Sequence, residues 1–205
     1  MSDIADLWDY RRQVSDAYAA ARTGQPSRET WLWWRGERDR LFSTHPQSPI
    51  EDQGSFDALP YFEYDARWRV VATFEPFEAV DEAIAHSGDG STEFKKVGSL
   101  LFEVDGEPAT LGAFWLDSYG GGMFVPFRDP TNGSATYGGG RYLLDTVKGA
   151  DLGSEGDRVI MDFNYAYHPS CVHSDRWSCP LAPPENRLEV AIEAGERLNA
   201  GPGGP

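Results

Sequence analysis

A short segment near the C-terminus gathers the most reactive side chains of the sequence. His168, Cys171, His173 and Cys179 fall within twelve residues, and imidazole and thiolate groups are ligands that zinc prefers. Their spacing, His-x2-Cys-x-His-x5-Cys, does not fit the structural zinc motifs. Three other interpretations stay open: the cysteines pair as a disulfide or redox couple, Cys171 is a nucleophile with His168 or His173 as its base, or the segment is an ordered loop.

Arg141, Asp162 and Asn164 form a second group with potential chemistry. Arg141 opens an apolar stretch, and a buried guanidinium needs a carboxylate or an anionic ligand beside it. Asp162 and Asn164 share one face of a predicted strand over 158–166, because alternate residues of a strand point the same way. The turn-rich residues 147–157 fit a hairpin between the two strands. We therefore predict that Arg141 and Asp162 form one site, which is an ion pair, an anion-binding site or an acid–base pair.

Three consecutive glycines, Gly138-Gly139-Gly140, precede Arg141. Nucleotide-binding loops place their glycines between a strand and a helix, but the stretch after Arg141 has the pattern of a strand. A sharp bend in the sheet is therefore favoured over a phosphate-binding loop. No cofactor is predicted from any part of the sequence.

Two helices and a series of strands must position these groups. Apolar residues at helical spacing predict helices over 3–23 and 29–42. Further along the chain the apolar period changes to two, which predicts strands. Asp105-Gly106 predicts a tight hairpin, because both turn residues adopt positive φ easily. The predicted strands cover 67–74, 97–104, 109–116, 123–127, 137–146, 158–166 and 188–194.

These elements predict a mainly β protein with N-terminal helices, an α+β chain whose seven or eight short strands form an antiparallel β-barrel or sandwich. We expect a helical segment over 1–45 that packs on the barrel, a barrel-like domain over 46–196 and a disordered tail over 197–205. Helices should lie only before about residue 45, and a single sheet system should follow residue 65. A chain of 205 residues suits one domain with a sizeable core.

The charge of the sequence restricts its partners. With 33 acidic and 18 basic residues, the formal net charge is −15, and such a field repels phosphate backbones and anionic lipid surfaces. We expect neither nucleic acid nor membrane as a partner, and a monomer or weak homodimer. The first residues lack the basic and apolar regions of a signal peptide, and no apolar run approaches the roughly 18 residues of a membrane span. A cytoplasmic location is expected, where Cys171 and Cys179 are reduced unless they are redox-active.

Several blocks of the sequence occur together in a recognisable order. They are Phe127–Gly133, Thr136–Leu143, Asp162–Cys171, Cys179–Leu188 and Ala194–Glu196, preceded by Trp34–Phe42 and Pro46–Pro49. In these blocks the chain resembles domain-of-unknown-function family 1684, over about residues 28–196. The chain departs from the family pattern at His168 and His173, where Asn and an aromatic residue are expected. Those departures argue against a family-wide zinc site or Cys–His pair, and no metal is predicted.

The resemblance implies no reaction, but the matching positions suit a polar pocket. Those positions are Tyr137, Arg141, Asp162, Asn164, Tyr167, Cys171, Cys179, Glu185 and Asn186. We predict that a small polar or anionic ligand binds inside or at the mouth of the barrel, to Tyr137, Arg141, Asp162, Asn164, Tyr167, Glu185 and Asn186. The alternative is an enzyme of hydrolase type with a carboxylate acid–base, and its catalytic candidates are Asp162, Glu185 and Cys171. The third interpretation is a structural polar network with no ligand.

Overall fold

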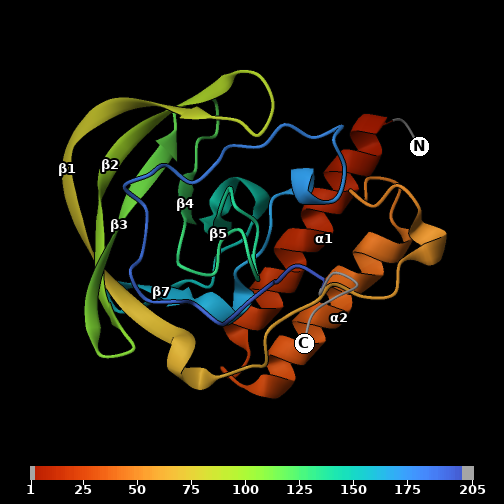
Figure 1. Ribbon diagram of the computed structural model, residues 1–205, viewed down its shortest axis with the longest axis horizontal. Coiled ribbons are helices and arrows are strands. Elements are labelled where there is room, and N and C mark those ends of the chain that lie inside the picture. The colour runs from red at the N-terminus through yellow and green to blue at the C-terminus, as the bar shows by residue number, and fades with distance from the viewer. Residues whose placement is uncertain (1–2, 200–205) are drawn as a thin grey trace.

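The computed structural model describes residues 3–199, and its first two elements are the predicted helices (Figure 1). Helix α1 spans Asp3–Thr23 and helix α2 spans Arg28–Thr44. The hydroxyl of Ser27 caps α2 by accepting a hydrogen bond from the amide of Thr30 at 3.3 Å, which satisfies one of the free amides of the first turn. Over residues 3–199, no helix is long and apolar enough to cross a bilayer.

Seven antiparallel strands follow the helices and form one sheet, as the change of apolar period predicts. The strand order is β5-β4-β3-β2-β1-β7-β6. The strands are β1 Arg69–Ala85, β2 Ser91–Val104, β3 Glu107–Leu116, β4 Met123–Phe127, β5 Arg141–Asp145, β6 Ser154–Glu155 and β7 Arg158–Asp162. Short 3-10 turns η1 to η5 cover Gln53–Ser55, Ala66–Trp68, Thr146–Lys148, Phe163–Tyr165 and Ser170–Val172. Figure 1 shows α1 and α2 on the side of β5 and β7, away from the long strands β1–β3.

The hairpin predicted at Asp105-Gly106 is confirmed. Val104 pairs with Glu107 across the turn, and the two turn residues have φ values of +54° and +81°. Strands β1 and β2 are much longer than predicted, with 17 and 14 residues. The register of β2 with both neighbouring strands shifts between Lys96 and Gly98. A Cβ atom at Gly98 would lie 2.6 Å from the carbonyl oxygen of Glu75.

The predicted barrel is not confirmed, because the sheet of the described residues is open. Strands β5 and β6 end the strand order at its two edges. The predicted strand 158–166 stops at Asp162, whose carboxylate accepts a hydrogen bond from the amide of Asn164 and so begins the turn η4. Beyond that turn, a single bridge between Tyr142 and Tyr167 connects β5 with the chain that follows β7.

The strand predicted over 188–194 is wrong, although its apolar side chains are buried. Leu188, Ile192 and Ala194 belong to the core, but none of them lies in a strand. Side chains replace the missing ladder. The amide of Ile192 donates to Asp129 at 2.7 Å, and the guanidinium of Arg141 donates to the carbonyls of Ile192 and Ala194.

The carboxylate partner of Arg141 is therefore Asp129 and not Asp162. Arg141 Nη2 lies 3.3 Å from Asp129 Oδ1, and both side chains are fully buried. The predicted pairing fails because β5 pairs with β4, whereas β7 pairs with β1 and β6. Asp162 instead lies opposite Arg69 in the β1–β7 register.

The described chain ends beside two loops, one before β1 and one between β4 and β5. The amides of Arg197 and Leu198 donate to the carbonyls of Pro60 and Ala135 at 2.9 and 2.8 Å. Residues 1–2 and 200–205, which include most of the predicted tail, lie outside the described part of the chain.

Apolar side chains fill both faces of the sheet. On the face toward the C-terminal segment, Leu100, Leu111 and Phe127 pack with Ile192. On the other face, aromatic residues of both helices, among them Trp31 and Trp34, pack with those of the sheet. The helices are thus held by a core of their own.

We predict that Arg141 and Asp129 are energetically coupled and that Arg141 and Asp162 are not. Breaking a buried pair leaves an uncompensated charge, so Arg141→Ala and Asp129→Ala should each lower the free energy of unfolding by about 3–5 kcal/mol. The double variant should lose clearly less than the sum of the two. Urea unfolding of both double-mutant cycles measures this, and the Arg141/Asp162 cycle is the matched control. Additive losses for Arg141 and Asp129 would contradict the prediction.

Candidate functional site

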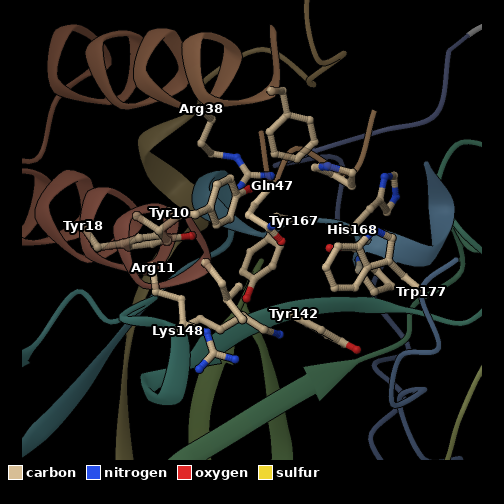
Figure 2. Close-up of a pocket in the computed structure, with 16 residues that line it drawn as sticks. Tyr10, Arg11, Tyr18, Arg38, Gln47, Tyr142, Lys148, Tyr167, His168 and Trp177 are labelled. Atoms are coloured by element: carbon tan, nitrogen blue, oxygen red, sulfur yellow. The ribbon is translucent and has the colours of Figure 1, made fainter. Parts of the chain in front are cut away.

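A pocket lies where the helices meet the edge of the sheet, and Figure 2 shows its lining. Its cavity has a volume of about 110 Å³. Residues of α1 and α2 form one side, and β5, the turn η3 and the chain after Ala166 form the other. The lining comprises Leu7, Tyr10, Arg11, Val14, Tyr18, Arg38, Phe42, Gln47, Pro49, Tyr142, Lys148, Tyr167, His168, Pro169, Ser170 and Trp177.

The lining carries three cations and no carboxylate. Arg38 lies above the pocket in Figure 2, and Arg11 and Lys148 lie below it. Arg38 and Lys148 each have a carboxylate outside the lining, since Arg38 pairs with Glu196 at 3.0 Å and Lys148 with Asp145 at 2.9 Å. Arg11 has no ion pair with any residue in the described chain. One positive charge at the pocket is therefore not neutralised.

Two donor groups of the lining are buried without a hydrogen-bond partner in residues 3–199. One is the hydroxyl of Tyr18, whose side chain is 2% exposed and extends from α1 toward the pocket (Figure 2). The other is the indole Nε1 of Trp177. A buried polar group without a partner costs free energy, and both groups can donate a hydrogen bond. The pocket thus offers free donors together with a free cation.

Glu196 fixes the upper wall of the pocket. Its Oε2 accepts a hydrogen bond from Arg38 and another, at 2.9 Å, from the amide of His168. Burial alone would raise the pKa of Glu196, but Arg38 and then His173 outweigh it and hold the pKa at about 2. Arg38 also donates to the hydroxyl of Tyr61 at 2.9 Å. The carboxylate therefore orients Arg38 as well as the chain at residue 168.

His168 is a neutral structural residue and not a base beside Cys171. Burial lowers its pKa to about 4, and its Nε2 accepts a hydrogen bond from the amide of Tyr137 at 3.2 Å. His173 lies beside Glu196 instead, with 3.5 Å between Nε2 and Oε1. In residues 3–199, no three His, Cys, Asp or Glu side chains are grouped to hold a metal ion.

The residues predicted to bind a ligand do not converge on one cavity, and Tyr167 is the one among them that lines the pocket. Its hydroxyl donates to Asp145 at 3.3 Å. Glu185 is exposed on another part of the surface, with its carboxylate 3.7 Å from Lys96. Tyr137 lies beside Cys171. The predicted residues therefore fall into separate groups.

Arg141, Asn164 and Asn186 are fully buried and hydrogen-bonded to the backbone. Asn186 donates to the carbonyls of Gly112 and Pro126 at 3.0 and 2.7 Å and accepts from the amide of Gly112 at 2.8 Å. Asn164 donates to the carbonyl of Asp65 at 2.9 Å and accepts from its amide at 3.1 Å. These amides join segments that are far apart in the sequence.

Asp162 lines a separate, smaller cavity of about 70 Å³ near the end of α1. Burial raises the pKa of Asp162, and its hydrogen bonds with Asn164 act in the opposite direction. One carboxylate oxygen, Oδ1, accepts both the amide and the side-chain Nδ2 of Asn164, at 3.0 and 2.8 Å. The carboxylate is thus occupied as the cap of η4.

The sequence prediction missed the pocket because its helical wall was assigned to packing. Val14 and Tyr18 lie on the buried side of α1 and belong to its apolar core. The available signal was Arg11, which lies on the same face at helical spacing from Leu7 and Tyr18. A cation within an apolar stripe indicates either a partner anion or a ligand.

Acid should destabilise the protein in two steps, for which His168 and Glu196 are responsible. The folded-state pKa of His168 lies below its ordinary value, so the unfolded state gains a proton first and stability falls as the pH drops from about 6.5 toward 4. The pKa of Glu196 is also lowered, so its contribution, on the order of 3 kcal/mol, is complete above about pH 4.5 and is lost as the pH falls toward 2.

Urea unfolding of the protein at several pH values measures both steps. Glu196→Gln should be less stable at pH 7, because Arg38 loses its partner, and should lose less stability between pH 4.5 and 2. The matched control is Glu193→Gln, three residues away and exposed. An unchanged pH dependence in Glu196→Gln would contradict the assignment.

Comparison with known proteins shows the family of the chain. A solution NMR structure of an uncharacterized protein from Haloarcula marismortui is 43% identical, with a TM-score of 0.61 over 84% of this chain and 95% of that protein. The search of curated proteins gives no match. Residues 54–197 match the family described as "Protein of unknown function (DUF1684)", so the match begins after α2, which the sequence resemblance included. The chain belongs to this family of unknown function.

Proposed function

We propose that the pocket between the helices and the edge of the sheet binds a small carboxylate with an apolar body. One observation supports the proposal above all: the lining presents cations and unpartnered donors but no carboxylate, in a protein with a net charge of −15. Acidic side chains outnumber basic ones in the sequence, so their exclusion from this lining favours an anionic occupant.

The size of the cavity restricts the ligand to a small molecule. Drug-sized ligands occupy cavities of roughly 300–1,000 Å³, and an apolar cavity of about 150 Å³ accommodates benzene. A volume of about 110 Å³ is smaller than both, so it suits a short aliphatic chain or a single ring that is partly enclosed. The polar group of such a molecule would lie toward Arg11 at the open side.

The lining suits such a molecule chemically as well. Leu7, Val14 and Phe42 supply apolar surface, and the rings of Tyr142 and Tyr167 meet edge to face with 5.6 Å between their centroids. Tyr18 lies on the same side of the pocket as Arg11, and Trp177 lies on the opposite side (Figure 2). A carboxylate beside Arg11 could therefore accept a hydrogen bond from the hydroxyl of Tyr18. Hydrogen bonds to charged groups contribute about 1.5–3 kcal/mol each.

The pocket replaces the barrel site that the sequence predicts. Asn164 and Asn186 are hydrogen-bonded to backbone groups, and both Nη atoms of Arg141 bond to backbone carbonyls or to Asp129, although its Nε has no partner in the described chain. None of the three lines the pocket. Their geometry supports the third interpretation, a structural polar network, for that part of the molecule. The proposal keeps the small anionic ligand that the sequence predicts, but its binding site is the pocket beside the helices and not the interior of a barrel.

For Asp162, the enzymatic alternative has one observation in its favour, the raised pKa of this carboxyl beside a cavity. A carboxylic acid of raised pKa can serve as a general acid. However, the described residues that line this cavity include no second carboxylate, histidine, cysteine or serine. We therefore propose binding rather than catalysis.

The proposal keeps the expected setting of the protein. A negative net charge is unfavourable for nucleic acid or an anionic membrane as partner, and it favours a monomer or a weak homodimer. The expected location of the protein is still the cytoplasm. A free small carboxylate is a partner that such a protein can meet there.

Benzoate and hexanoate test the proposal, each with its uncharged amide as the comparison. Heteronuclear NMR titration should give dissociation constants on the order of 0.1–1 mM for at least one of the acids. The corresponding amide should bind about tenfold more weakly, because it lacks the charge that Arg11 attracts. If neither acid binds, or if acid and amide bind equally, the proposal is wrong.

Tyr18→Phe separates binding from folding. Without a ligand the variant should be as stable as the parent protein or more stable by about 1 kcal/mol, because it removes a buried hydroxyl that has no partner. Its affinity for the acid should nevertheless fall about tenfold. A structural tyrosine would show the reverse, a loss of stability with unchanged affinity.

Neighbouring arginines of α1 provide the matched control. Arg11→Gln should weaken binding of the acid by about fivefold at low salt. Arg12→Gln removes the same charge from the next position, where Arg12 pairs with Asp9 and does not line the pocket. Equal effects of the two substitutions would show only a general response to net charge.

A further inference from the structure

The two cysteines meet outside the pocket lining, at the far end of the segment that forms one of its walls. Cys171 lies in η5 and Cys179 in the extended chain after it, and their side chains are hydrogen-bonded to each other. Both thiols are free and partly exposed. They are thus in contact, unoxidised and accessible to a small reagent.

Two hydroxyl groups lie beside Cys171. The side chains of Ser87 and Tyr137 are both hydrogen-bonded to it. The hydrogen bond with Cys179, followed by those with Ser87 and Tyr137, lowers the pKa of Cys171 to about 6. The pKa of Cys179 is raised well above its usual range by the same contact with Cys171 and by burial. The two thiols are therefore unequal, with one stabilised as a thiolate.

The end of the long β1–β2 hairpin holds Cys179 in place. The amide of Ser87 donates to the carbonyl of Cys179 at 2.9 Å, and the amide of Cys179 donates to the hydroxyl of Ser87 at 3.2 Å. Two residues further, the amide of Leu181 donates to the carbonyl of Ala85 at 2.8 Å. Strand pairing on one side and η5 on the other thus keep the sulfur atoms together.

We infer that Cys171 and Cys179 form a reversible dithiol–disulfide site, in which Cys171 attacks and Cys179 resolves. The co-reactant is a low-molecular-weight disulfide, RSSR. The thiolate of Cys171 attacks one sulfur of RSSR, forms the mixed disulfide and releases RS⁻. Cys179 then gives up its proton to solvent and attacks the sulfur of Cys171, which forms the Cys171–Cys179 bond and releases a second RS⁻. The protein loses two electrons and two protons, and RSSR becomes two RSH.

The site needs neither histidine of the segment. His168 accepts the amide of Tyr137 and His173 lies beside Glu196, so both are engaged elsewhere. The hydroxyls and the second thiol supply the stabilisation that a base would otherwise give Cys171. The site is also independent of the carboxylate pocket, because neither cysteine belongs to its lining.

Oxidised glutathione tests the site on the full-length, reduced protein at pH 7. After incubation and quenching with a thiol-alkylating reagent, intact mass spectrometry should show loss of two hydrogen atoms and no glutathione adduct. Dithiothreitol should restore the dithiol. A small dithiol added to the same buffer serves as the control. If that dithiol is oxidised while both thiols of the protein can still be alkylated, the inference is wrong.

Single variants test the roles of the two cysteines. Cys179→Ser should stop at a stable glutathione adduct on Cys171, because the resolving thiol is absent. Cys171→Ser should form its adduct at least about tenfold more slowly, because the remaining thiol has no lowered pKa. Equal adduct rates in the two variants would overturn the assignment of the attacking thiol.

Ser87→Ala keeps both cysteines and removes one hydroxyl beside Cys171. The rate of disulfide formation should fall a few-fold, and its pH midpoint should move upward, because the thiolate loses a hydrogen bond. Circular dichroism confirms that each variant is folded before its rate is compared. An unchanged pH midpoint would contradict the stabilisation of the Cys171 thiolate by Ser87.

Discussion

The buried pair of Arg141 and Asp129 determines where the C-terminal segment lies, and the pocket depends on that segment. Arg141 holds the carbonyls of Ile192 and Ala194, and Asp129 holds the amide of Ile192. Two residues beyond Ala194, Glu196 reaches Arg38 of α2. The same interaction that replaces a strand ladder therefore places the carboxylate that orients a pocket cation. Burying such a pair gives little net stability, so its main contribution is to specify one arrangement of the chain.

The pocket shows how an acidic protein can present a positive site. Two of its cations are paired with carboxylates, the buried Arg38 with Glu196 and the exposed Lys148 with Asp145. The balancing carboxylates lie outside the lining, so their charge stabilises the cations without occupying the cavity. Arg11 is exposed to water and has no ion-pair partner in the described chain. The resulting field is local, since charges farther than a Debye length of about 8 Å are largely screened.

Local patterns in the sequence predicted the elements correctly where hydrogen bonding is local. The helices and the Asp105-Gly106 turn satisfy their own backbone groups, and both were found. Alternation over 188–194 predicted burial correctly but not pairing, because burial depends on side chains and a ladder needs a free neighbouring edge. Arg141 was correctly predicted to need a buried carboxylate. Its partner was not identified, because that choice depends on which strands pair, a non-local property.

The pocket also joins two parts of the chain that have different relations to the family. Tyr142, Lys148 and Tyr167 lie within the matched residues 54–197, whereas Arg11 and Tyr18 precede them. Helix α1 is attached to the rest of the molecule by its own apolar face and by an exposed ion pair of Arg22 with Asp151, a kind of pair that contributes little. A ligand that touches α1 and β5 together would bind the docked helix and not the undocked one. By linkage, its binding free energy would add to the docking of α1, so ligand and helix would stabilise each other.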